Sequence, residues 1–126
     1  MKTLVQCMVI GLAGFAGSLA RFGVSSLCGR WFGTAFPVGT LVVNLSGSLL
    51  LGWFLAVIDH RWMVSETTRV AIAVGFVGAF TTFSTLMYES SALMEGGAMN
   101  KAMANLIGNL LLGLICVKIG LWLGGR

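Results

Sequence analysis

Charge is scarce in this sequence. Only eight of its 126 residues are Lys or Arg and four are Asp or Glu, whereas roughly a quarter of the residues of a soluble domain are charged. Hydrophobic residues make up 57% of the chain, and its mean hydropathy is +0.94. These values exclude an ordinary soluble domain and predict an integral membrane protein.

The chain also has few residues that support enzymatic chemistry. His60 is its single histidine, so no Ser/His/Asp or H-E-x-x-H arrangement can be assembled. Its three cysteines, Cys7, Cys28 and Cys116, form no C-x-x-C pair, and we interpret them as small buried apolar residues. The net charge of +4 comes from scattered residues rather than a basic cluster. The sequence therefore predicts no enzyme, no catalytic residues and no nucleic-acid partner.

Four stretches lack charge: Thr3 to Ala20, Trp31 to Ile58, Val70 to Tyr88 and Ala102 to Val117. Each approaches or exceeds the length of about 20 apolar residues that a membrane-spanning helix needs. We therefore expect an all-α protein with one domain, residues 1–126, built of four transmembrane helices and surrounded by membrane lipid. Four short helices can hardly enclose a pathway alone, which favours association with a second copy.

Local signals mark the ends of these helices. Pro37 suits the first turn of the second helix, which we expect to run to about Ile58. Ser65 before Glu66 is typical of a capped start of the third helix. Gly96 and Gly97 predict the turn before the fourth helix. Arg21 is expected near the far end of the first helix, either reaching the membrane interface or facing an aqueous vestibule that attracts anions.

The third stretch contains the most unusual segment, residues 75–85. Gly75 and Gly78 each weaken a helix by about 1 kcal/mol, and the four hydroxyls that follow can replace backbone hydrogen bonds lost in a break. We expect this helix to break near mid-membrane. The alternative is an unbroken helix with small residues for close packing and hydroxyls bonded to the carbonyls four residues earlier.

Two polar tracks accompany this segment. Thr40, Asn44 and Ser48 recur at every fourth position of the second helix, and Asn105 and Asn109 do the same on the fourth. The amide of Asn44 is suited to replace water around an anion. Alternatively, it only joins two helices by a hydrogen bond.

Basic residues are almost balanced between the two sides of a four-span chain. Lys2, Arg61, Arg69, Lys118 and Arg126 fall on one side, and Arg21, Arg30 and Lys101 on the other. So weak a bias permits insertion in both orientations. Two oppositely oriented copies would form an antiparallel homodimer of dual topology with both broken helices at its centre.

The chain resembles the Fluc/CrcB family of fluoride channels over essentially its whole length. The resemblance rests on a G-x-x-G-x-x-T-T-F-S-T pattern at 75–85, a P-x-G-T-L-x-x-N-x-x-G pattern at 37–47 and a G-x-x-x-R pattern at 17–21. It implies an antiparallel homodimer in the inner or plasma membrane of a bacterium, which carries fluoride passively through two pores and holds one structural sodium ion at its centre. The residues so implied are the pore lining, Thr40, Asn44, Thr82, Phe83, Ser84, Leu86, Asn105 and Asn109; Arg21 in the vestibule and Glu89 near the other mouth; and the backbone carbonyls of Gly78 and Thr81, which would hold the sodium.

The sequence departs from that family at several positions. Leu86 stands where a second pore phenylalanine is usual, and Met87 replaces a usual serine. Asn105 and Asn109 fall where the family tends to have tyrosine and serine or other polar groups. The rival function is a small proton-coupled multidrug exporter, but that needs a carboxylate within the membrane, and here Glu89 lies near a helix end. A structural membrane protein would need no ordered polar tracks.

Overall fold

The computed structural model describes residues 2–60 and 63–126, and these residues form helices and short connections. Among them, four stretches are long and apolar enough to cross a membrane, as the sequence predicts. In chain order the elements are α1 (Lys2–Phe32), α2 (Val38–His60), α3 (Glu66–Val70), the π-helix η1 (Ala71–Val77), α4 (Gly78–Phe80), α5 (Phe83–Glu95) and α6 (Met99–Gly124).

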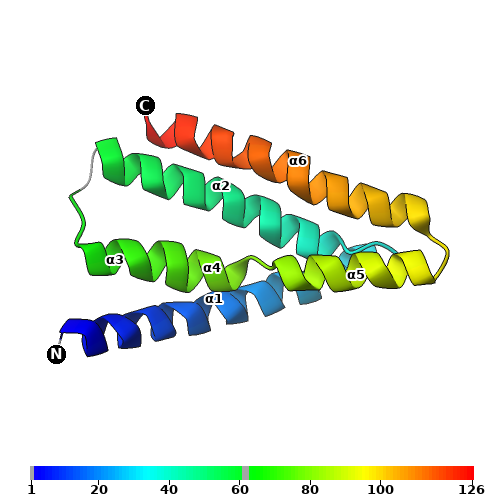
Figure 1. Ribbon diagram of the computed structural model, residues 1–126, viewed down its shortest axis with the longest axis horizontal. Coiled ribbons are helices and arrows are strands. Elements are labelled where there is room, and N and C mark those ends of the chain that lie inside the picture. Colours follow the sequence, from blue (N-terminus) through cyan, green and yellow to red (C-terminus); the bar gives the residue numbers. More distant parts are fainter. Residues whose placement is uncertain (1, 61–62) are drawn as a thin grey trace.

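The helices lie side by side along one long axis (Figure 1). The α2 helix packs mainly against α6, and α1 packs mainly against η1 and also against α2 and α4. The elements from α3 to α5 form the third span (Figure 1), of which η1 and α4 pack against α1 and α5 packs against α6. Both chain ends lie at the same end of the bundle, as an even number of antiparallel spans requires (Figure 1).

The predicted helix ends agree with the structure in most places. The hydroxyl of Ser65 caps α3 by accepting a hydrogen bond from the backbone N–H of Thr68, and Gly97 takes the positive φ of 76° that turns the chain toward α6. The α1 helix, however, runs 31 residues, well past the predicted end near Arg21. It continues because nothing between Arg21 and Phe32 stops it: one charged side chain at a span end does not break a helix, and the first proline is Pro37.

One prediction about the cysteines is wrong. Cys28 is buried and Cys116 is half-buried, but Cys7 is exposed. Cys7 lies on the part of α1 that carries the exposed apolar residues Leu4, Val5 and Met8. An apolar side chain on such a surface needs no burial in protein because the lipid is itself apolar.

The third span is broken, as predicted, and the break lies at its middle, but not at the glycines. Gly78 keeps helical angles, with φ −62° and ψ −36°, and Gly75 serves close packing, since a methyl group there would lie 2.8 Å from the carbonyl oxygen of Ile10 on α1. The chain instead becomes extended at Thr81 (φ −80°, ψ 159°) and Thr82 (φ −150°, ψ 119°). The break therefore needs a cause other than weak helix propensity.

Candidate functional site

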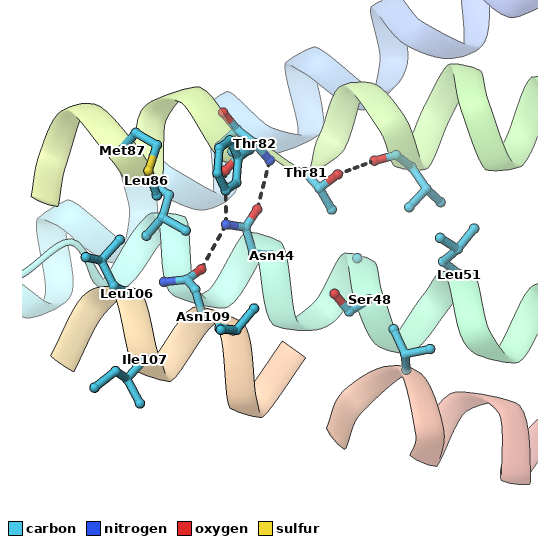
Figure 2. A pocket seen from close by; sticks show the side chains of 15 residues that line it. Asn44, Ser48, Leu51, Thr81, Thr82, Leu86, Met87, Leu106, Ile107 and Asn109 are labelled. Atoms are coloured by element: carbon cyan, nitrogen blue, oxygen red, sulfur yellow. Dashed lines mark hydrogen bonds between the residues drawn. The ribbon is translucent and has the colours of Figure 1, made fainter. Parts of the chain in front are cut away.

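A polar clamp from α2 holds the break. The side-chain Oδ1 of Asn44 accepts a hydrogen bond of 2.8 Å from the backbone N–H of Thr82, and its Nδ2 donates one of 3.1 Å to the carbonyl of the same residue. In Figure 2 the Asn44 amide lies directly against the backbone of Thr82. Because the Thr82 N–H is bound by Asn44, it does not close the next α-helical turn on the carbonyl of Gly78. The clamp thus explains why the helix stops here.

One hydroxyl at the break satisfies a helix end, as the sequence predicts. Thr82 Oγ1 accepts from the backbone N–H of Thr85 at 3.3 Å and so caps α5, while donating to the Thr85 hydroxyl at 2.9 Å. This backbone N–H therefore gains a partner, as a membrane interior demands. The Thr81 hydroxyl instead donates at 3.0 Å to the Val77 carbonyl, four residues earlier, which already accepts from the Thr81 N–H.

A cavity of about 450 Å³ lies along the break, between α2, α5 and α6. Its lining includes Asn44, Thr81, Thr82, Phe83 and Leu86, together with Asn109 from α6. The ring of Phe83 is 74% exposed within a single chain. Most other side chains around this cavity are apolar, so it combines a short row of polar groups with a water-poor wall (Figure 2).

A second cavity, of about 640 Å³, lies on the other side of Thr82. It is lined by Arg21 from α1, Thr40 from α2 and Thr85 and Glu89 from α5, so Glu89 lies in the same cavity as Arg21 rather than near an opposite mouth. Thr82 lines both cavities. The break therefore lies between the two cavities, with Arg21, Thr40 and Glu89 on one side and the amides of Asn44 and Asn109 on the other.

Most of the residues singled out from the sequence come together here. Asn44, Thr82, Phe83, Leu86 and Asn109 line the first cavity, and Thr40, Thr82, Arg21 and Glu89 line the second. Of the described residues proposed for the pore, Ser84 and Asn105 line neither cavity. Ser84 is exposed, and Asn105 is wholly buried between helices.

Sequence reasoning missed three features of the site. The residue Thr85 lines the second cavity, and within the described residues its hydroxyl finds no acceptor for its own proton. Gly47 lies opposite the break, where a methyl group would meet the Cγ2 atom of Thr81. The bond from Asn44 to the backbone of Thr82 joins residues 38 positions apart. Thr85 and Gly47 both lie within the sequence patterns given above, at 75–85 and 37–47. No feature of the neighbouring sequence, however, indicates which distant residues they contact.

A cation site made of side chains finds no support in the described residues, since no three His, Cys, Asp or Glu side chains gather there. Backbone oxygens are the alternative. The N–H that would serve the Gly78 carbonyl in a continuous helix is bound by Asn44, and the following carbonyls lie where the chain turns from helical to extended. These carbonyls are oxygen ligands of the kind that hard cations bind.

The fold and the site define a small multi-pass membrane protein with a broken span that carries a polar row between two cavities. A family model described as "CrcB-like protein, Camphor Resistance (CrcB)" matches residues 8–121. The chain therefore belongs to the CrcB family.

Three curated relatives share the name "Fluoride-specific ion channel FluC", which describes a channel and not an enzyme. The relative from Hydrogenovibrio crunogenus is 39% identical over 96% of this chain and 92% of its own length. The relative from Nitratidesulfovibrio vulgaris is 43% identical over 94% of this chain and 96% of its own. A longer relative from Methylococcus capsulatus is 44% identical over 97% of this chain, which spans 54% of that protein.

Proposed function

We propose that this chain is a subunit of a passive fluoride channel. The observation that carries the proposal is the break at Thr81 and Thr82, which places Thr82 between two cavities and the exposed Phe83 on the wall of the first. The names of its relatives support fluoride as the ion rather than the multidrug cations of a proton-coupled exporter.

Fluoride is small and strongly hydrated, so a selective pore must replace its lost water with hydrogen-bond donors. Threonine and serine hydroxyls supply such donors. The edge of an aromatic ring carries partial positive charge and also favours an anion. In this proposal the path leads from the vestibule around Arg21 and Glu89, past Thr40 and Thr82, to the ring of Phe83. Its remaining wall is formed by Asn44, Leu86 and Asn109, while Ser84 and Asn105 lie outside both cavities of the single chain.

The active unit proposed is an antiparallel homodimer of dual topology. The first cavity is an open groove in one subunit, and the apolar side chains Phe83, Ile107 and Leu110 on its wall are 74%, 48% and 66% exposed. A second copy would cover them and close the groove. The near-balance of basic residues supports both orientations, with Arg61 lying outside the described residues.

A structural sodium ion is proposed at the centre of that dimer. The carbonyls of Gly78 and Thr81 from each of two copies would surround it, and the engagement of the Thr82 N–H by Asn44 leaves the Gly78 carbonyl suited to this role. Bound there, the ion would supply positive charge between the two anion pathways without being transported.

Fluoride efflux from liposomes that contain the purified chain tests the function directly. A fluoride-selective channel releases trapped fluoride at once when the membrane potential is short-circuited, and retains chloride in a parallel preparation. Efflux that requires a proton gradient, or equal release of both anions, would contradict the proposal.

A further inference from the structure

A chain of hydrogen-bonded side chains leads from the break into the helices behind it. Besides clamping Thr82, Asn44 Nδ2 donates to Oδ1 of Asn109 at 2.8 Å (Figure 2). Asn109 Nδ2 in turn donates to Oδ1 of Asn105 at 3.0 Å and to its backbone carbonyl at 2.9 Å. Asn105 Nδ2 donates to Ser90 Oγ on α5 at 3.1 Å. Four segments, namely the break, α2, α6 and α5, are joined by this one chain.

The side-chain bonds that link its members run in one direction, whereas the second bond of Asn44 Nδ2 returns to the Thr82 carbonyl. Each side-chain amide accepts through its oxygen from the preceding member and donates through its nitrogen to the next, so that the amide dipoles align head to tail. Hydrogen bonds arranged in this way polarise and strengthen one another. The chain is also withdrawn from solvent, since Asn105 is 0% and Ser90 is 2% exposed. Both features favour a single fixed arrangement.

The hydrogen-bonding capacity of Asn44 is almost exhausted. Its amide has two N–H donors, and these are directed to the Thr82 carbonyl and to Asn109. An anion in the first cavity therefore finds no unused N–H on Asn44. Both N–H groups of this side chain therefore bind other parts of the protein. The residue has a structural role here, although its place in the sequence suggests that it binds the ion directly.

We infer that Asn44, Asn109 and Asn105 act as positioning residues that fix the backbone of Thr82. Through this backbone they also set the positions of the Thr82 hydroxyl, between the two cavities, and of the Phe83 ring, on the wall of the first. We call these three asparagines the amide relay. The inference that the relay fixes the backbone does not depend on the proposed function, whereas the inference that it affects ion flux rests on that function. The geometry of the break is thus set by side chains of α2 and α6 rather than by the residues of the broken span.

Hydrogen exchange of backbone amides in the folded protein reports on this role at single residues. The Thr82 N–H is bound by Asn44, whereas the neighbouring Thr81 N–H donates to the Val77 carbonyl at 3.0 Å and serves as the internal reference. In Asn44→Leu, exchange at Thr82 should rise by about tenfold relative to Thr81, the change expected for loss of one hydrogen bond.

Variants of Asn109 separate positioning from simple helix adhesion. Asn109→Leu leaves the clamp itself intact but removes the oxygen that accepts from Asn44, so it should raise exchange at Thr82 by about threefold. Asn109→Asp keeps that oxygen but loses the two hydrogen bonds that Nδ2 donates to Asn105, so it should restore protection at Thr82 only in part. The matched control is Ser46→Ala on α2, because the Ser46 hydroxyl bonds only to carbonyls of its own helix, those of Val42 and Val43.

Fluoride efflux measured on the same samples tests the link to function. If the amide relay positions the break, fluoride efflux should fall more in Asn44→Leu than in Asn109→Leu, because Asn44→Leu loses more protection at Thr82. Ser46→Ala should change neither efflux nor protection. Unchanged exchange at Thr82 in folded Asn44→Leu would overturn the inference. The inference would also be overturned if Asn109→Leu lowered the melting temperature but left amide exchange at Thr82 unchanged relative to Thr81. Absence of fluoride efflux in the unaltered protein would instead contradict the proposed function, and the exchange result would still stand.

Discussion

The hydroxyl of Thr40 donates a hydrogen bond of 2.8 Å to Oε1 of Glu89 and so joins α2 to α5, across 49 positions of sequence. The other carboxyl oxygen, Oε2, is buried and has no hydrogen-bond partner within the described residues. Both side chains line the second cavity with Arg21. The bond from Thr40 therefore holds a carboxyl group whose remaining oxygen lacks a donor.

Loss of this hydroxyl should be costly. Thr40→Val keeps the shape of the side chain but leaves a second carboxyl oxygen without a donor, which lowers the free energy of unfolding by about 1–3 kcal/mol. Thr40→Ser keeps the hydroxyl and is the control. We expect reduced thermal stability and reduced fluoride efflux in the valine variant alone. Equal behaviour of the two variants would show that the bond contributes to neither property.

Phe83→Ile should abolish fluoride efflux or reduce it sharply. The substitution removes the positively polarised ring edge from the wall of the first cavity but keeps an apolar side chain there. Phe15→Ile on α1 is the matched control, because Phe15 is similarly exposed but lines neither described cavity. A stably folded Phe83→Ile protein with unaltered efflux would contradict the placement of this ring in the pore.

Gly47→Ala should displace Thr81. The added methyl group would meet Thr81 Cγ2 and lie 3.2 Å from Cδ1 of Phe80, and Thr81 is held in place by its bond to the Val77 carbonyl. We expect a loss of about 1–3 kcal/mol in the free energy of unfolding, as for other overpacked sites, together with reduced efflux.

A second substitution tests that explanation. Thr81→Ser removes the Cγ2 atom but keeps the hydroxyl, so the double variant with Gly47→Ala should recover most of the loss. Gly11→Ala is the control for an added methyl group, since nothing lies within 4 Å of that position. If the double variant is no more stable or active than Gly47→Ala alone, the added methyl group does not act through Thr81 Cγ2.

Two added lysines at either end of the bundle should bias insertion and reduce activity in a chain expressed alone. Co-expression with a copy biased in the opposite sense should restore it, because the proposed dimer needs both orientations. Reporter fusions at a terminus measure the orientation. A single orientation for the unaltered chain would rule out dual topology.

Replacement of sodium by a large organic cation should weaken the dimer and lower efflux. Gly78→Leu should have the same effect by crowding the centre of the dimer. Within one chain there is room for the new side chain, because a methyl group at Gly78 would lie 3.8 Å from the Ala73 carbonyl oxygen. Thr81→Ser, which leaves the backbone ligands intact, should be mild. Dimer mass and efflux are measured in sodium-free detergent and liposomes. Full activity without sodium would refute the structural ion alone.

Much of the architecture follows from local sequence. Four uncharged stretches specify four spans because apolar length and the thickness of lipid are matched, whatever the spans contact. Ser65 and Gly97 mark a helix start and a turn through their own backbone preferences. The periodic spacing of Thr40 and Asn44, and of Asn105 and Asn109, likewise places each pair on one face of its helix.

The position and cause of the break were decided by tertiary structure. Gly75 and Gly78 remain helical because Gly75 packs against α1 and nothing draws Gly78 out of the helix. Thr82 leaves the helix because the amide of Asn44, 38 residues earlier, supplies both a donor and an acceptor to its backbone. Helix propensity indicates where a chain yields easily, but the break forms where a partner from another helix compensates the lost backbone hydrogen bonds.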